Sequence, residues 1–218
     1  MNGLTKIAGW IPQLLSGAVV TISLTLCAVV AGLIIGIFLA LGSMSKKKVF
    51  RAISKAYVFF FRGTPLLMQL YFVYYGLPQI NEALNISNKF LAAFIAFGLN
   101  SGAYCSEIFR SAIQSIDKGQ MEAGKVLGLS YMQTMRLIIL PQSIKRLIPP
   151  IGNEFIMMLK DASLVSIIAL ADITKVTRSI QSSTGSSLVF IPAMILYLII
   201  TAVFSLLFRW LEKKNTYE

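Results

Sequence analysis

Hydrophobic and polar positions fall into long blocks along this chain. Five apolar segments alternate with polar stretches and cover residues 13–42, 56–79, 90–116, 147–170 and 188–208. An α-helix rises about 1.5 Å per residue, so about 20 apolar residues cross the roughly 30 Å core of a bilayer. The pattern therefore predicts an all-α, polytopic membrane bundle of five transmembrane helices, with the whole chain, 1–218, as one transmembrane domain.

Composition supports a membrane protein over a soluble one. Hydrophobic residues make up 56% of the chain and charged residues only 13%, a balance that is unusual for a soluble domain. The net charge of +11 at first suggests a protein that binds nucleic acid. In an apolar chain, however, a basic excess more often marks cytoplasmic loops.

The positions of the basic residues predict the orientation. Most follow the first, third or fifth segment: Lys46, Lys47, Lys48, Arg51, Lys55, Arg110, Lys118, Lys125, Arg136, Lys145, Arg146, Arg209, Lys213 and Lys214. By the positive-inside rule, the N-terminus is outside, the C-terminus is inside, and the polar loop 117–146 is cytoplasmic.

Within that loop, the stretch "GQMEAGKVLGLS" nearly matches an ATP-binding P-loop. The match fails at Val126, because a P-loop needs Ser or Thr there to ligate magnesium, and no strand precedes Gly119. The sequence also has no histidine, which excludes histidine-based triads and the usual zinc sites. Cys27 and Cys105 lie in apolar segments, where buried free cysteines are expected. We therefore expect no catalytic centre in this chain.

The same loop carries a second pattern. Its register is E-A-A, three residues, G, nine residues, then I-x-L-P. In this chain the matching residues are Glu122-Ala123-Gly124, Gly128 and Ile138-Ile139-Leu140-Pro141. In this the chain resembles the permease subunits of binding-protein-dependent ABC importers, with Gly124 in place of the second alanine. Four further stretches resemble the polar amino-acid branch of these permeases: "FFRGTPLLMQLYFVYYGLP", "AYCSEIFRSAIQSIDKGQ", "LPQSIKRLIPPIGNEFI" and "LKDASLVSI". Ala162 departs from the Thr that is usual in that branch.

The resemblance implies a transport subunit in a bacterial cell membrane. Its expected partners are two ATPase subunits, a second permease subunit that is identical or related, and an extracellular or periplasmic amino-acid-binding protein. No cofactor is expected in this chain, since the ATPase subunits would bind ATP and magnesium. The loop would be the coupling helix, contacting the ATPase through Glu122, Ala123, Gly124, Leu127, Gly128 and Leu129.

Local chemistry is compatible with that role. We expect Glu122 in the first turn of the helix, where an acid complements the helix dipole, and Gly128 in a left-handed turn. Leu127, Leu129 and Met132 would be exposed and available to a partner. The alternative is a loop helix packed against its own bundle.

Polar residues inside the apolar segments mark a candidate amino-acid site. Asn100, Ser101 and Tyr104 fall near the middle of the third segment. Glu154 and Asp161 lie in the fourth, seven residues or nearly two turns apart, and so face the same way. Intramembrane acids usually face a cavity or a partner, and an amino acid supplies an ammonium group. In "RGTP", Pro65 breaks the second segment, so that Gly63 and Thr64 are placed to meet the carboxylate.

Structural roles remain open for several of these residues. Arg62 can neutralise Glu154 or Asp161, and Asn100 and Tyr104 can simply join helices by hydrogen bonds. Asp161 can be satisfied by its neighbours Lys160 and Ser163. Glu107 and Arg110 can pair at three-residue spacing. The glycine pairs Gly32/Gly36 and Gly98/Gly102 are interpreted as close-packing faces.

Two other functions remain as alternatives. An ion-gradient-driven secondary transporter would also place acids and broken helices in mid-membrane, although no inverted repeat is visible. A membrane-embedded enzyme would need a nucleophile motif that the chain lacks. The residues and the resemblance together predict a permease subunit of an ATP-driven importer for polar or cationic amino acids, working by alternating access.

Overall fold

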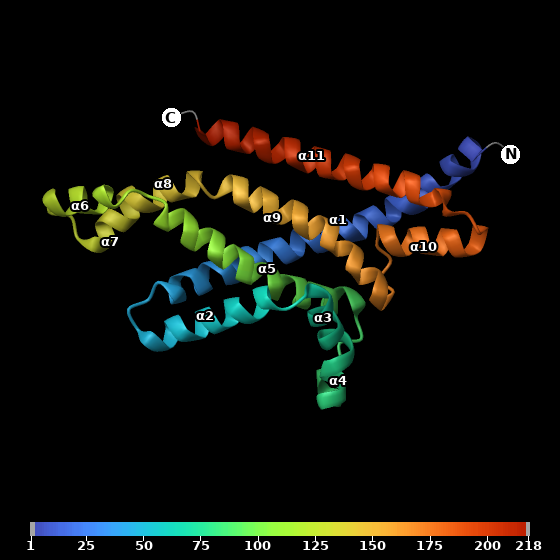
Figure 1. Cartoon of the computed structure of the whole chain (residues 1–218), viewed down its shortest axis with the longest axis horizontal. Coiled ribbons are helices and arrows are strands. Elements are labelled where there is room, and N and C mark those ends of the chain that lie inside the picture. The colour runs from blue at the N-terminus through green and yellow to red at the C-terminus, as the bar shows by residue number, and fades with distance from the viewer. Residues whose placement is uncertain (1–2, 217–218) are drawn as a thin grey trace.

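The computed structural model describes residues 3–216, with side chains over 9–214, and this part of the chain contains helices and no strands. Its long helices run roughly along one axis and form an elongated bundle (Figure 1). They are α1 (Gly3–Ser43), α2 (Lys48–Gly63), α5 (Lys89–Gln114), α9 (Ile148–Asp161) and α11 (Phe190–Thr216). The prediction of an all-α fold is therefore confirmed for the described residues.

The tightest helix pair is α1 on α5, and small residues account for it. A Cβ placed on Gly32 would lie 2.6 Å from the Cβ and Oγ of Ser101, and one on Gly36 would lie 2.6 Å from the Cβ of Cys105. A Cβ on Gly102 would likewise lie 2.6 Å from Cγ2 of Ile35. Backbones approach this closely only where side chains are absent. The predicted close-packing role is confirmed for these three glycines, while Gly98 has ordinary spacing, 3.4 Å from the Cβ of Ala31.

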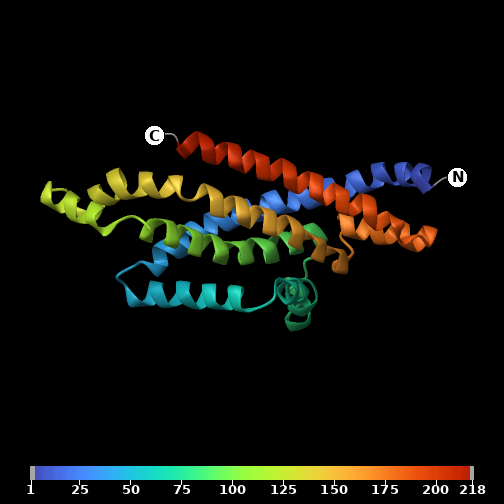
Figure 2. The same ribbon diagram turned by 45° about the horizontal axis from the view of Figure 1, so that its top comes forward.

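The second apolar segment is not one helix. It breaks at Thr64 and Pro65, as expected for a proline without a backbone N–H. After the break the chain turns away from α2, which Figures 1 and 2 show from two directions. The turned part consists of α3 (Leu66–Tyr71), a π-helical turn η1 (Phe72–Gly76), α4 (Leu77–Ile80) and a 3₁₀ turn η2 (Glu82–Leu84). Helix α2 also begins at Lys48, earlier than the predicted start at residue 56.

The polar loop 117–146 is helical, as predicted. It contains α6 (Lys118–Val126), α7 (Tyr131–Thr134), a π-helical turn η3 (Met135–Ile139) and α8 (Leu140–Lys145). A reciprocal capping box joins Ser130 and Gln133 at the start of α7. Helices α6 and α7 lie at one extreme of the long axis, the end at which the C-terminus lies (Figure 1).

The fourth segment ends as an α-helix at Asp161 and continues as a 3₁₀ turn, η4 (Ala162–Ile168). A helix that the sequence did not predict, α10 (Ile173–Thr184), follows it, and a 3₁₀ turn η5 (Ser187–Val189) leads into α11. Asp172 caps α10 by accepting hydrogen bonds from the N–H groups of Thr174 and Lys175, both at 2.9 Å. Burial raises the pKa of this carboxyl, and the two N–H donors oppose that effect.

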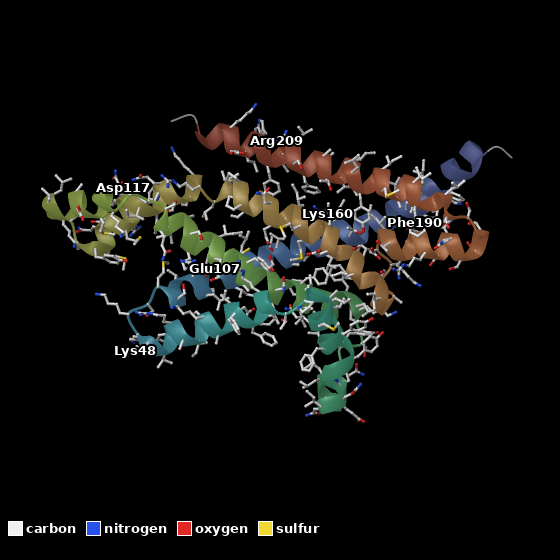
Figure 3. The ribbon with its side chains drawn as sticks, in the orientation of Figure 1. Lys48, Glu107, Asp117, Lys160, Phe190 and Arg209 are labelled. Atoms are coloured by element: carbon white, nitrogen blue, oxygen red, sulfur yellow. The ribbon has the colours of Figure 1, made fainter. Side chains whose placement is uncertain are left out.

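The arrangement agrees with a membrane protein without fixing the number of spans. By length and apolar composition, two helices of the described part qualify, over Gly9–Ser43 and Ser187–Lys214. The two chain ends lie at opposite ends of the bundle (Figure 1), and Lys48 and Asp117 lie toward the C-terminal end (Figure 3). Five spans and the N-out, C-in orientation stay predictions. The predicted domain 1–218 includes residues 1–2 and 217–218, which lie outside the described residues.

Candidate functional site

A cavity of about 440 Å³ opens between the break after α2, the middle of α5 and the C-terminal half of α9. Figure 3 marks two of these helices by Glu107 on α5 and Lys160 on α9. Six of the seven residues predicted for the amino-acid site line this cavity: Gly63, Thr64, Asn100, Tyr104, Glu154 and Asp161. The structure thus brings them together, while their contact with a substrate stays a prediction.

The two acids share the cavity but differ in surroundings. Glu154 is 6% exposed and accepts a hydrogen bond of 2.8 Å from the Ser101 hydroxyl. Asp161, one residue before η4, is exposed. Ser101, the seventh predicted residue, is fully buried against α1 and does not line the cavity. Its place is behind Glu154, where it orients the carboxylate.

The carbonyls freed by the Pro65 break are satisfied from inside the protein. The Gln69 side-chain amide donates to the carbonyl oxygens of Phe61, at 3.0 Å, and Thr64, at 3.1 Å. Asn100 donates to the same Phe61 carbonyl at 3.1 Å and to Oε1 of Gln69 at 3.0 Å. Asn100 therefore joins α5 to the break, as one alternative held, and lines the cavity as well.

Sequence reasoning missed Gln69, although a signal was present. Gln69 is a polar residue in an apolar segment, four positions after a proline, where helical geometry returns its side chain to the break. Reasoning also missed the apolar lining, Leu66, Leu67, Met157, Met158 and Leu164. Nothing in the sequence separates these residues from lipid-facing ones, because the whole segments are apolar.

Arg62 does not pair with either cavity acid. Its Nη1 lies 3.7 Å from Oε2 of Glu107, and its guanidinium stands over the Tyr104 ring, 5.2 Å from the centroid. Glu107 is held more closely by Arg110, with Nε–Oε1 3.0 Å and Nη2–Oε2 2.6 Å, which confirms the predicted pair. Arg62 therefore makes no ion pair with Glu154 or Asp161 among the described residues, and neutralisation of these acids by Arg62 at longer range stays a prediction.

Two expectations about the break concern a ligand and stay predictions. We expected Gly63 to let the backbone approach a ligand closely, and a Cβ placed there would meet nothing within 4 Å, so this space is open. We also expected N–H groups freed at a helix terminus to hold a carboxylate. The helix after the break begins at Leu66 and continues from α3 through η1 into α4, with right-handed helical backbone at both junctions.

The loop residues predicted to contact an ATPase form a compact unit at the end of the molecule. Leu127 is 75% exposed and Met132 69%, as expected, with Val126 even more exposed, whereas Leu129 is half-buried. Glu122 and Ala123 are exposed on α6, and Gly128 has the predicted positive φ, 76°. Exposed apolar side chains of this kind suggest a partner. Contact with an ATPase stays a prediction for all six residues.

Glu122 is not in the first turn of its helix. Helix α6 begins at Lys118, and Asp117 caps it by accepting a hydrogen bond of 2.6 Å from the Gly119 N–H. Our placement of Glu122 at the positive end of the dipole is therefore wrong, and Asp117 takes that role. Glu122 lies in the second turn, with its side chain free to meet another molecule.

The chain is similar to known transport proteins over nearly its whole length. It is 38% identical over 205 residues to the L-cystine transport system permease protein TcyB of Bacillus subtilis (strain 168), covering 93% of this chain and 86% of that one. It is also 38% identical over 205 residues to the arginine transport system permease protein ArtQ of the same organism, covering 94% and 93%. Among solved structures, the crystal structure of an amino acid ABC transporter with histidines matches with a TM-score of 0.92 and 39% identity, covering 98% of this chain and 99% of that one.

The sequence profile of one family matches residues 32–217. These residues include the cavity wall, the break after α2 and the loop from α6 to α8. The chain belongs to the binding-protein-dependent transport system inner membrane component family.

Proposed function

We propose that this protein is the permease subunit of an ATP-driven importer for polar or cationic amino acids. Family membership, the arginine and cystine permeases among its relatives and the likeness to an amino acid ABC transporter all support an amino-acid substrate. An ion-gradient-driven transporter finds no support in these comparisons.

The observation that carries the proposal is the pairing of two carboxylates in one cavity. Glu154 and Asp161 line the same 440 Å³ space, with Arg62 as the cation at its edge. Acids placed within a membrane are costly unless a counter-charge meets them. An amino acid with a cationic side chain brings two positive groups and one negative group, which complements two acids and one guanidinium.

In this proposal the chain itself hydrolyses nothing. Two ATPase subunits bind ATP and magnesium, and Val126, Leu127 and Met132 on the loop from α6 to α7 are the exposed apolar contacts for one of them. A second permease chain completes the pathway, and a binding protein delivers the amino acid from outside. Closure of the ATPase pair then moves the bundles between inward-open and outward-open arrangements.

The test is Asp161→Asn in the complete complex of permease, ATPase and binding protein, reconstituted in vesicles. We expect the L-arginine concentration that half-stimulates ATP hydrolysis to rise by about tenfold, because a charge-assisted hydrogen bond is lost. Glu82→Gln is the matched control, since Glu82 is exposed on η2 and away from the cavity. An unchanged response in Asp161→Asn would contradict the site assignment.

A further inference from the structure

Arg62 stands where three open spaces meet. It lines the 440 Å³ cavity of the candidate site, a second cavity of about 470 Å³ beside α2 and a third of about 390 Å³ that reaches Arg146 and Pro150. Its side chain is 43% exposed. The guanidinium, near the C-terminal end of α2, is therefore reachable by a small molecule in the candidate site.

The guanidinium is only partly engaged. Its one ion-pair partner among the described residues, Glu107, already receives two short hydrogen bonds from Arg110, whereas the 3.7 Å contact with Arg62 is too long for a hydrogen bond. None of the hydrogen bonds within residues 9–214 involves the Arg62 guanidinium. A guanidinium carries five N–H donors in one plane, so most of its donor capacity is available.

Tyr104 holds this group in position. The ring lies under the guanidinium, 5.2 Å from centroid to Cζ, and also lines the candidate cavity. A cation–π contact of this kind holds a guanidinium beside the ring face and leaves N–H donors open to a ligand. An open guanidinium edge binds a carboxylate through two parallel hydrogen bonds.

The cavity is thus bipolar. One cation enters it from α2, and the two acids Glu154 and Asp161 enter it from α9. An α-amino acid carries its carboxylate and ammonium on one carbon, and a cationic side chain extends a second positive group. We propose that Arg62 binds the α-carboxylate of the substrate and that the site thereby selects amino acids over amines with the same side chain. This inference rests on the proposed function, and it names the group that orients the substrate.

The test uses two ligands that differ in that carboxylate alone. L-arginine and agmatine share a guanidinium side chain and an amino group, but agmatine has no carboxylate. Their binding is measured by calorimetry on the purified permease–ATPase complex, without the binding protein, so that only the membrane site selects. For the unmodified complex, we expect L-arginine to bind about tenfold or more tightly than agmatine.

In Arg62→Gln the affinity for L-arginine should fall by about tenfold or more while the affinity for agmatine stays the same. Arg62→Lys should retain part of the preference, since it keeps the charge and loses the two-pronged geometry. Lys55→Gln is the control: it removes one charge from the same helix, and Lys55 lines the second cavity but not the candidate site. We expect Lys55→Gln to bind both ligands normally.

An equal loss of affinity for both ligands in Arg62→Gln would overturn the inference, because it would mean that Arg62 only supports the fold. Unchanged binding of L-arginine would overturn it as well. The proposed function is tested separately by Asp161→Asn, which should weaken the binding of L-arginine and of agmatine alike. If Asp161→Asn changes neither ligand while Arg62→Gln removes the preference, the acidic wall is wrong and the carboxylate contact stands.

Discussion

Gly124 is the residue at which this chain departs from the E-A-A signature, and the structure explains the departure. Gly124 is buried, and a Cβ placed on it would lie 2.5 Å from Oγ1 and 2.6 Å from Cγ2 of Thr134. Thr134, at the end of α7, is fully buried. The space that an alanine methyl would need is therefore already filled by Thr134, and α6 packs on α7 through this contact.

We expect Gly124→Ala to push α6 away from α7 and to destabilise the loop by about 1–3 kcal/mol, as overpacking does. Stimulated ATP hydrolysis by the reconstituted complex should fall, because the exposed residues on α6 lose their position. The double variant Gly124→Ala with Thr134→Ala should recover part of the activity. Gly9→Ala, where a Cβ meets nothing within 4 Å, is the matched control, and equal effects of the two single variants would contradict the explanation.

At the scale of elements, the bundle depends on how closely α1 approaches α5. A Cβ on Gly36 would lie 2.6 Å from the Cβ of Cys105 and 2.9 Å from the backbone N of Ser106. A backbone atom in a long helix cannot move aside alone. Gly98 faces the same helix pair, but a Cβ there would make ordinary contact, 3.4 Å from Ala31.

Gly36→Ala should therefore lower the melting temperature of the protein in detergent, at a cost of about 1–3 kcal/mol. Gly98→Ala should be neutral or slightly stabilising, because alanine favours helix over glycine by up to about 1 kcal/mol. Thermal unfolding followed by circular dichroism compares the two. Similar losses in both variants would mean that the close approach is not what stabilises this pair.

The backbone carbonyls at the break after α2 have hydrogen-bond partners within the protein. Pro65 removes a hydrogen-bond donor, and the freed carbonyls of Phe61 and Thr64 receive the Gln69 amide. In a membrane such carbonyls need internal partners, because lipid offers none. Arg62 and Gly63, which lie between these two carbonyls in the sequence, line the cavity together with Tyr104 and Glu154.

At the scale of the whole molecule, the orientation in the membrane is the main open prediction. The starting protein for the test has Cys27 and Cys105 replaced by alanine. Single cysteines are then introduced as Ser182→Cys on α10 and Lys118→Cys on α6, both at exposed positions. Five spans with the N-terminus outside place Ser182 outside and Lys118 inside.

A membrane-impermeant maleimide added to intact cells without an outer membrane should label Ser182→Cys. Lys118→Cys should react only after the membrane is made permeable. Labelling of Lys118→Cys in intact cells would invert the orientation and remove α6 from the reach of a cytoplasmic ATPase. Labelling of both in intact cells would contradict the span count.

The sequence alone determined what depends on local spacing. Runs of apolar residues predicted the long helices, Pro65 predicted the break, and the signature between Glu122 and Pro141 predicted the family and the left-handed Gly128. These features need only neighbouring residues, because a helix and a turn are made by the chain around them. Helix ends were less predictable, and the capping role of Asp117 was missed. The short helix α10 was missed as well.

Only the tertiary structure decided which side chains from separate segments meet. It directs Ser101 to Glu154, Asn100 to Gln69 and to the Phe61 carbonyl at the break, and Arg62 to Tyr104. Residues more than 30 positions apart come together through the angles and depths at which helices pack, and hydrophobic pattern does not encode these. The polar residues of the cavity can therefore be predicted from the sequence. Packing decides which of their side chains orient other side chains and which remain open to a ligand.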